Sequence, residues 1–318
     1  MSIQAGAAIF DNCEFTNITV DYESTGNGAG GAIKMDCGVL YINRSKLTNI
    51  TVTNSTGSVV GGAMYFGSCS STDVTIMNTI IADNLVSYTG GSGQYIEIRG
   101  GAINSFAAGG NIQLINSTVV NNTLSSTSSS QDGPIQGSAI FAGDWNSDGY
   151  SPYLTIFNSI IHGNRKVMYA GSSSEAGTNY GQVYIHDGNN EGVEGYAYYS
   201  LIGGENNIEG DEILNLEPEF LDSTYALHPR SPAIGAGAVQ GEDADGNTIY
   251  APTEDIAGNM RPNPADDDEY EDREAVPDLG AWESELAVTP YPDAPTDLFV
   301  IEDHRSVQLF WNASDAED

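Results

Sequence analysis

Short segments in which apolar and polar residues alternate recur along most of the chain. Three eight-residue copies align without gaps, at 74–81, 112–119 and 154–161. Alternation with a period of two places every second side chain on the same face of a strand. The side chains that share this apolar face are Val74 and Ile76, Ile112 and Leu114, and Leu154 and Ile156. The pattern therefore predicts equivalent strands, each with one face buried.

Asparagine marks the same two places in each copy. The first set is Asn78, Asn116 and Asn158, and the second, six residues later, is Asn84, Asn122 and Asn164. Asparagine tolerates left-handed backbone geometry, and its amide can bond to the equivalent amide of the next copy. We therefore interpret both sets as corners that stack into ladders, which is a structural role.

A glycine-led apolar segment precedes each strand, at 31–33, 62–64, 101–103 and 137–140. The whole unit repeats with a period of roughly 30 to 40 residues, which is typical of a solenoid. Stacked in parallel about 4.8 Å apart, about six such units make a rod on the order of 30 Å long. The sequence predicts an all-β parallel β-helix solenoid. The insertions that we expect to leave it as surface loops are 85–100, 123–136 and 165–181.

The glycine-led starts and the Asn-Ser-Ile-Ile units resemble the right-handed parallel β-helix of the pectate-lyase-like superfamily, in its large group of bacterial surface proteins. The stretch that follows resembles the closing region called the choice-of-anchor Q domain. Its five matching blocks, in order, are 218–220, 225–227, 231–237, 255–262 and 277–283. Beyond residue 285, the segments 294–298 and 307–311 resemble the first two strands of a fibronectin type III domain.

The resemblance implies four parts. They are parallel β-helix repeats at 1–222, the closing region at 223–285, a linker at 286–294 and an incomplete fibronectin type III domain at 295–318. A last coil without cover presents open strand edges and apolar core, so we expect the closing region to act as a C-terminal cap. Because the chain opens directly in repeat and stops after two strands, we expect an internal fragment whose neighbours are other domains of the same longer chain.

Charge restricts the classes of partner. The 318 residues include 44 Asp and Glu but only 10 Lys and Arg, a formal net charge of -34. Phosphate binding requires Lys and Arg to displace counterions, which argues against nucleic acid and anionic membranes as partners. No apolar run is long enough to cross a bilayer, so direct membrane insertion is not expected. The acidity suits either a solvated surface in salty surroundings or recruitment of Ca²⁺.

The three cysteines, Cys13, Cys37 and Cys69, match neither a disulfide scaffold nor a zinc site in number and spacing. We interpret them as residues of the wall or core. Cys37 and Cys69 follow similar glycine-led starts in successive repeats, so they would stack, and both a pair and two free thiols stay open.

One loop carries metal-ligand spacing. Asp144, Asn146 and Asp148, followed by Gly149, reproduce the first half of a calcium loop, in which alternating oxygen side chains converge on one hard cation. The twelfth position is Thr155 rather than the bidentate Glu, and a plain Asx-rich corner loop is the alternative. The segment 243–247 is a second, shorter candidate that we interpret as a turn.

His162, Arg165 and Lys166 form the best catalytic candidate, because β-helix polysaccharide lyases and hydrolases combine carboxylates, calcium and a basic residue. The paired Asp and the Arg-x-Lys pattern of polygalacturonase-like enzymes are not present in order. The alternative, which we favour, is that these residues lie at a surface corner without a catalytic role. Function must be argued from a site rather than from the fold.

Loop aromatics supply the chemistry for carbohydrate contact, since rings stack on sugars, although they also serve as loop anchors. They are Trp145, Tyr150, Tyr153, Tyr169 and Tyr180. We therefore expect a non-catalytic extracellular module, secreted or attached to the cell surface, that serves adhesion or polysaccharide and cell-surface glycan contact. The alternatives are a β-helix polysaccharide lyase or glycoside hydrolase and a passive structural spacer.

Overall fold

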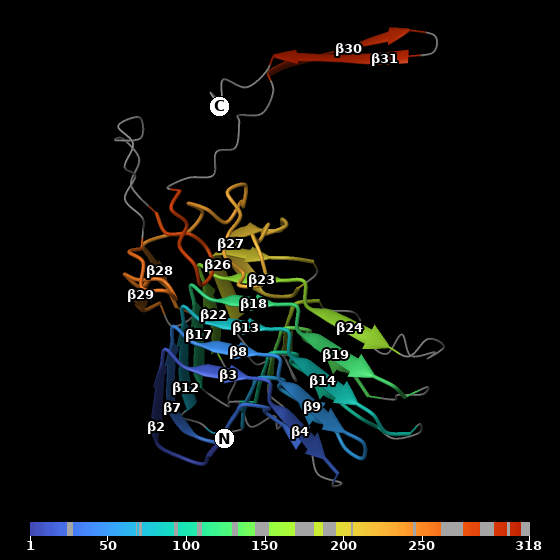
Figure 1. Ribbon diagram of the computed structural model, residues 1–318, viewed down its shortest axis with the longest axis vertical. Helices are drawn as coiled ribbons and strands as arrows, with labels where there is room; N and C mark the ends of the chain where they lie inside the picture. Colours follow the sequence, from blue (N-terminus) through green and yellow to red (C-terminus); the bar gives the residue numbers. More distant parts are fainter. Residues whose placement is uncertain are drawn as a thin grey trace.

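The chain folds into stacked coils of short parallel strands (Figure 1). The computed structural model describes residues 1–23, 28–67, 69, 72–91, 95–106, 110–128, 133–143, 153–168, 181–186, 195–204, 206–243, 246–261, 276–286, 296–303 and 306–312. Within these ranges every regular element is a strand, and no helix is present that could cross a membrane. The predicted all-β parallel β-helix is confirmed.

Four parallel sheets, named A to D here, run along the solenoid. Sheet A contains β1 (Ser2–Ile3), β6 (Ile33–Met35), β11 (Met64–Phe66), β16 (Ile103–Ser105), β21 (Ile140–Gly143) and β25 (Val183–His186). Sheet C contains β4 (Thr19–Tyr22), β9 (Thr51–Asn54), β14 (Leu85–Tyr88), β19 (Thr123–Ser126) and β24 (Arg165–Met168). Sheet D contains β5 (Gly28–Ala29), β10 (Val59–Val60), β15 (Ile98–Arg99) and β20 (Ile135–Gln136).

Sheet B consists of two rows of strands separated by a corner. The first row is β2 (Ala7–Asp11), β7 (Gly38–Asn43), β12 (Thr72–Met77), β17 (Asn111–Ile115) and β22 (Tyr153–Phe157). The second row is β3 (Glu14–Thr16), β8 (Lys46–Thr48), β13 (Ile80–Ala82), β18 (Thr118–Val120) and β23 (Ile160–His162). The long strand β26 (Gly195–Ile202) pairs with the last strands of both rows and with β27 (Glu209–Leu214).

The strand register follows the aligned sequence copies. Val74 pairs with Ile112, and Ile112 pairs with Leu154, so the equivalent side chains stack directly. All three are 1% exposed and belong to one continuous apolar core inside the solenoid. The period-two alternation therefore identified the inward face correctly, because every strand in these rows lies against the same core.

The predicted surface insertions are partly wrong. Each begins with a strand of sheet C and two of them end with a strand of sheet D: β14 and β15 lie in 85–100, β19 and β20 in 123–136, and β24 in 165–181. These strands are short and rich in Ser and Thr on the outside, as in Thr123–Ser126, whose one inward apolar side chain is Leu124. Such segments have the composition of loops although β14, β15 and β19 are paired on both sides, and β20 and β24 on one side.

The asparagines at the corners are of two kinds, which differ in backbone conformation. Left-handed backbone occurs at Asn78, Asn116 and Asn158, as predicted, and again at Asp83 and Asn121. The next residues, Asn84, Asn122 and Asn164, have no such backbone and are buried. Their amides form the predicted ladder, with Nδ2 of Asn84 donating to Oδ1 of Asn122 at 2.8 Å and Nδ2 of Asn122 donating to Oδ1 of Asn164 at 2.8 Å.

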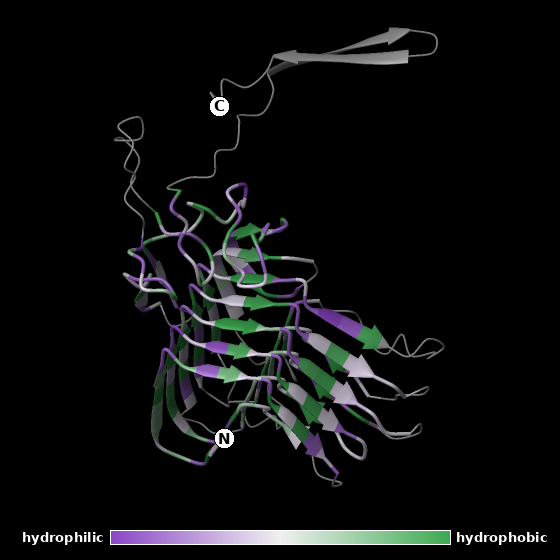
Figure 2. Ribbon diagram, in the orientation of Figure 1, coloured by the Kyte–Doolittle hydropathy of each residue, from purple (hydrophilic) through white to green (hydrophobic). Residues whose placement is uncertain are grey.

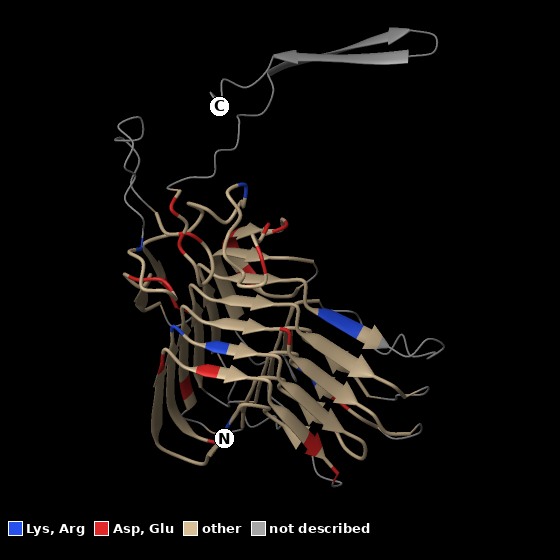
Figure 3. Ribbon diagram, viewed as in Figure 1, with Lys and Arg blue, Asp and Glu red and all other residues tan. Residues whose placement is uncertain are grey.

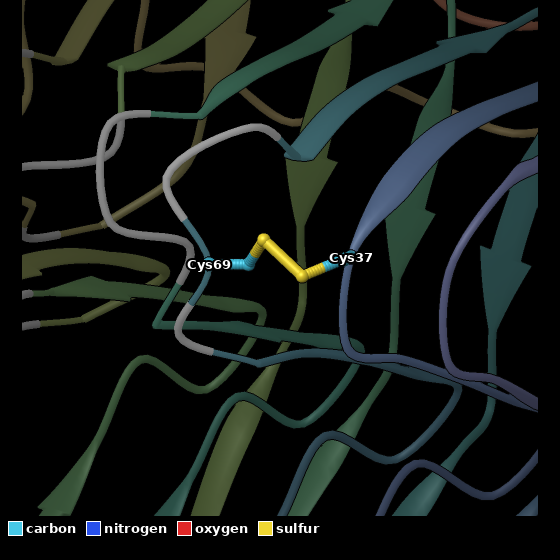
Figure 4. Close-up of a disulfide and its surroundings, with 2 residues drawn as sticks. All are labelled: Cys37 and Cys69. Carbon is cyan, nitrogen blue, oxygen red and sulfur yellow. A yellow bond between two sulfur atoms is a disulfide. The ribbon is translucent and has the colours of Figure 1, made fainter.

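A disulfide links the second and third coils (Figure 4). It joins Cys37, between β6 and β7, to Cys69, between β11 and β12, with Cα atoms 5.5 Å apart. The stacking of equivalent loop positions brings the two thiols together, so the pair that the sequence left open is present. Cys13 is a free, half-buried cysteine.

The closing region packs on the flank of the solenoid. The second row of sheet B carries apolar residues on its outer face as well as its inner face, and Figure 2 shows β13, β18 and β23 largely in the colour of hydrophobic residues. These outward side chains form one buried cluster with the closing region: Ile80, Ala82, Val120, Ile160 and Leu201 with Tyr225, Leu227, Ala233, Ile234, Ile256, Leu279 and Ala281. These apolar contacts lie along the side of the solenoid, and the role of the closing region as an end cap stays a prediction.

The C-terminal end of the solenoid is met by other groups. β27 adds to the edge of β26, and the side-chain amide of Asn207 bonds to both the N–H and the carbonyl of Ile185 in the last strand of sheet A. Two antiparallel hairpins follow in the chain, formed by β28 (Gln240–Glu242) with β29 (Thr248–Tyr250) and by β30 (Thr296–Asp303) with β31 (Ser306–Asn312). The second hairpin occupies the segment that resembles a fibronectin type III start.

Candidate functional site

The three catalytic candidates do not converge on one point. His162 faces the segment that follows β27, where its Nε2 lies 3.6 Å from Oε1 of Glu217. Arg165 is exposed at the start of β24, and its Nε donates to Oγ1 of Thr123 at 3.3 Å. Lys166, the next residue, points to the opposite face of the same strand, as the alternation of a strand requires. A cluster of three cooperating basic groups is therefore not formed.

Lys166 lies in the inward stack of sheet C. It pairs in register with Leu124, which pairs with Val86, and both of these are fully buried. Among the described residues its Nζ has no hydrogen-bond partner. Burial disfavours the charged ammonium and lowers the pKa of Lys166 to about 8. This amine is inside the solenoid rather than at a surface site.

The calcium candidates Asp144, Asn146 and Asp148 lie outside the described residues, as do four of the five loop aromatics. The described part of the chain contains no group of three or more His, Cys, Asp or Glu side chains that could hold a metal ion. The second candidate, Asp243, is buried and its Oδ1 accepts the backbone N–H of Asn247 at 2.8 Å. This contact closes the turn between β28 and β29, as the sequence predicts.

Aromatic side chains line the outer face of sheet A, where we define the sheet A strip as Tyr65, Phe106, Phe141, Tyr184 and His186. The ring centroids of Tyr65 and Phe106 are 6.1 Å apart, those of Phe106 and Phe141 5.5 Å, and those of Phe141 and Tyr184 5.7 Å. Phe141 is buried, and the other four members are partly exposed. The strip therefore extends along the solenoid axis from β11 to β25.

Arg99 anchors the strip from the neighbouring sheet D. Its guanidinium carbon lies 4.6 Å from the ring centroid of Phe141, and the side chain is 1% exposed. Its NH1 lies 3.3 Å from Oε2 of Glu97, and its Nε donates to Oε1 of Gln136. Burial lowers the pKa of Arg99 and raises that of Glu97, and each charge opposes the effect of burial on the other. The planar group is thus fixed against the ring.

The strip is close to neutral within a strongly acidic protein. Lys34 lies 5.7 Å from the ring centroid of Tyr65 and 3.9 Å from Oδ1 of Asp36, so this cation also has a carboxylate beside it. Arg99 and Glu97 balance in the same way. Burial raises the pKa of Tyr65, which keeps its phenol uncharged. Among the described residues, the strip therefore offers rings and hydroxyls, and each of the two cations beside it is balanced by a carboxylate.

A pocket of about 340 Å³ lies at the corner between the second row of sheet B and sheet C. It is lined by Asp83, Asn121, Gly163 and Arg165. Of the predicted site residues, Arg165 is part of it. His162 precedes Gly163 in the chain but faces Glu217.

Known proteins give no further assignment: no protein-family model matches the chain, and neither a curated protein nor a solved structure matches it. The resemblances to the pectate-lyase-like superfamily, the choice-of-anchor region and the fibronectin type III domain therefore rest on the motifs alone. Function has to be argued from the side chains.

The sequence contains a signal for the strip that the alternation of sheet B conceals. Tyr65 and Phe141 occupy the same place in two of the glycine-led segments, one residue after Met64 and Ile140, and Asn104 occupies that place in the segment between them. Aligning these segments rather than the better-registered sheet B strands would have identified both rings. For the pocket no such signal exists, because it is a place where a side chain is missing.

Proposed function

We propose that this protein is a non-catalytic extracellular module that contacts neutral glycans through the sheet A strip. The observation that carries the proposal is the row of partly exposed rings along the solenoid axis. Sugars present C–H groups on one face, and aromatic rings are the side chains that pack on such faces. A polymer laid along the axis would meet a ring in each of several coils, so weak contacts would add along its length.

Charge supports a neutral partner. With a net charge of -34, the protein repels polyanions at long range, whereas the strip has Lys34 beside Asp36 and Arg99 beside Glu97. The Cys37–Cys69 disulfide supports an oxidising location outside the cytoplasm, where such bonds persist. Secretion or attachment to a cell surface, and the presence of other domains in the same longer chain, belong to this proposal.

Affinity electrophoresis tests it directly, because an acidic protein migrates readily through a native gel. The parent should be retarded by at least one neutral polysaccharide cast into the gel, among β-glucan, galactomannan and xylan. Tyr184→Ala combined with His186→Ala should reduce the retardation and raise the dissociation constant derived from it roughly thirtyfold, since each stacking ring contributes about 1 kcal/mol. Tyr250→Ala, at a tyrosine that is 61% exposed on β29, is the matched control and should bind as the parent does.

Two results would contradict the proposal. One is the absence of retardation in all three gels, and the other is equal retardation of the parent and the double variant. The double variant must show the same thermal unfolding as the parent, because Phe141 packs on both substituted rings.

A polysaccharide-degrading enzyme is the second candidate, favoured by the 3.6 Å approach of His162 to Glu217 and by Asp83 in the pocket with Arg165. Acid–base cleavage of a glycosidic bond requires such groups. Release of new reducing ends or of unsaturated uronates from the same polysaccharides would establish it. Loss of that product in Glu217→Gln would assign the site.

A further inference from the structure

The corner pocket exists because a stack of side chains is interrupted. The left-handed position at the second corner is Asn17, Asn49, Asp83 and Asn121 in successive coils, and then Gly163. A Cβ atom at residue 163 would lie 2.6 Å from Oδ1 of Asn121. Glycine therefore leaves open the space that a further asparagine would fill, and the Asn121 oxygen faces it.

Tyr225 of the closing region orients two of the pocket residues. Its hydroxyl donates to Oδ2 of Asp83 at 2.6 Å and accepts from Nδ2 of Asn121 at 3.2 Å. Burial and the Asp83 carboxylate raise the pKa of Tyr225, so the phenol keeps its proton. These two hydrogen bonds fix the side chains of Asp83 and Asn121. The Oδ1 atoms of both residues are left to accept hydrogen bonds from a ligand.

Arg165 supplies donors at the same pocket. Its guanidinium bonds to Thr123 through Nε, and within the described ranges no carboxylate lies within 4 Å of it. Figure 3 shows the start of β24 as a basic segment at the end of sheet C, next to β19. The strands β19, β14 and β9 of this sheet carry no charged residue. The pocket thus contains one cation, one anion and one amide.

We propose that this pocket binds one unit of a neutral glycan through adjacent hydroxyl groups. A pair of hydroxyls can donate to the oxygens of Asp83 and Asn121 and accept from Arg165, so each pocket group has a complementary partner. An anionic sugar would face the Asp83 carboxylate and the overall negative charge of the protein. The balance of charges within the pocket therefore selects neutral hydroxyls over carboxylates.

The site is independent of the sheet A strip. The pocket lies between sheets B and C, whereas the strip lies on the outer face of sheet A, and the two share no residue. A protein that fails to bind polymers through the strip would still bind a single sugar here. The two proposals can therefore fail separately.

Saturation-transfer NMR with methyl glycosides of glucose, galactose and mannose, and with galacturonate, tests the pocket in the full chain. The parent should bind at least one neutral glycoside at millimolar concentration. Gly163→Ala, which fills the space, and Asp83→Asn, which removes the anion and keeps an acceptor for Tyr225, should each weaken binding roughly tenfold or more. The strip double variant should bind as the parent does.

Asn49→Ala is the matched control for Gly163→Ala, because it also places alanine at a left-handed corner of the same stack but away from the pocket. Binding that persists in Asn49→Ala and is lost in Gly163→Ala supports the site. The proposal is overturned if no neutral glycoside binds, if galacturonate binds more tightly than all of them, or if both alanine variants bind equally well.

Discussion

Two adjacent residues at each second corner of the solenoid differ sharply in what surrounds them. The inner stack, Asn84, Asn122 and Asn164, is buried, and every amide bonds to backbone and to the next amide. The outer stack, one residue earlier, is Asp83, Asn121 and Gly163, and lines a pocket. In these three coils the outer stack changes chemistry from coil to coil, whereas the inner stack is asparagine each time; in the coil before them Ile50 occupies the inner place.

The physical reason is the cost of an unpaired polar group. Inside the solenoid no water replaces a lost hydrogen bond, so a buried amide must meet both its donor and acceptor requirements. At the outer position the residues are exposed, so the main requirement is tolerance of the left-handed backbone, which asparagine, aspartate and glycine all meet. The inner stack is therefore committed to stability, and the outer stack is where a binding function can be placed without loss of the fold.

The largest effect should come from Asn122→Ala. Asn122 donates to the carbonyls of Ile81 and Val120 and to Asn164, and its Oδ1 accepts from the backbone and side chain of Asn84. Removing it leaves several buried groups unpaired, and we expect a loss of about 3 to 5 kcal/mol in unfolding free energy by urea titration. Asn121→Ala, one residue earlier, should cost about 1 kcal/mol or less. Equal losses would refute the division between the two stacks.

The second prediction concerns a buried carboxyl group whose burial is compensated in a different way. Asp278, in the closing region, accepts N–H groups of Gly235 and Ser284 beside the buried Arg261–Glu283 pair. Burial and the Glu283 carboxylate raise the pKa of Asp278 from 3.8 to about 8. Binding of a proton removes the charge of Asp278, whereas in the inner stack a neighbouring amide satisfies the buried polar group.

The direction in which stability changes with pH follows from the difference in bound protons between the folded and unfolded states. Between the ordinary and the raised pKa the folded state holds a proton that the unfolded state lacks, so its stabilisation is complete below pH ~4 and is lost as pH rises through ~8. We expect Asp278 to lower stability by roughly 2 to 4 kcal/mol between these limits. Asp278→Asn, compared with the parent in urea at both pH values, should show a smaller decline. Glu283→Gln provides a second variant, and parallel declines in all three proteins would contradict the prediction.

The sequence predicts those parts of the molecule that repeat. The first-row strands and the corner asparagines recur at matching positions, so Val74, Ile112 and Leu154 could be placed without coordinates. Gln182 could not, although its Oε1 accepts from Nδ2 of Asn164 at 2.7 Å and completes the inner ladder. It enters only 18 residues after Asn164, from a part of the coil where no asparagine is expected.

Contacts between the solenoid and the closing region also cannot be predicted from the sequence. Tyr225 bonds to Asp83 across 142 residues of sequence, and its sequence block resembles a motif without indicating what it packs against. Arg165 was selected for its charge, and the structure places it at a pocket that Gly163 creates. A missing side chain has no sequence pattern, so the pocket follows from stacking geometry alone.

Lys166 offers a third, smaller test, because it is an inward polar group without the partners of the inner ladder. Its pKa is lowered from 10.5 to about 8, so the folded state binds fewer protons than the unfolded state between these values, and stability rises with pH there. Lys166→Met keeps the length and removes the amine. Discounted for partial solvent contact, it should stabilise the protein by about 1 kcal/mol at pH 7 in urea, and less at pH 10. A destabilised variant would show that the amine has a partner.

The smallest effect should separate backbone from side chain in the outer stack. Asn49 is exposed and has φ of 56°, a conformation that costs alanine about 1 kcal/mol and glycine almost nothing. Asn49→Ala should therefore lower the unfolding free energy by about 1 kcal/mol or less, and Asn49→Gly by less than Asn49→Ala. If both variants lose the same amount, the Asn49 amide itself stabilises the corner. The outer stack would then be less free to change, and Gly163, which lacks such an amide, would carry a cost in stability.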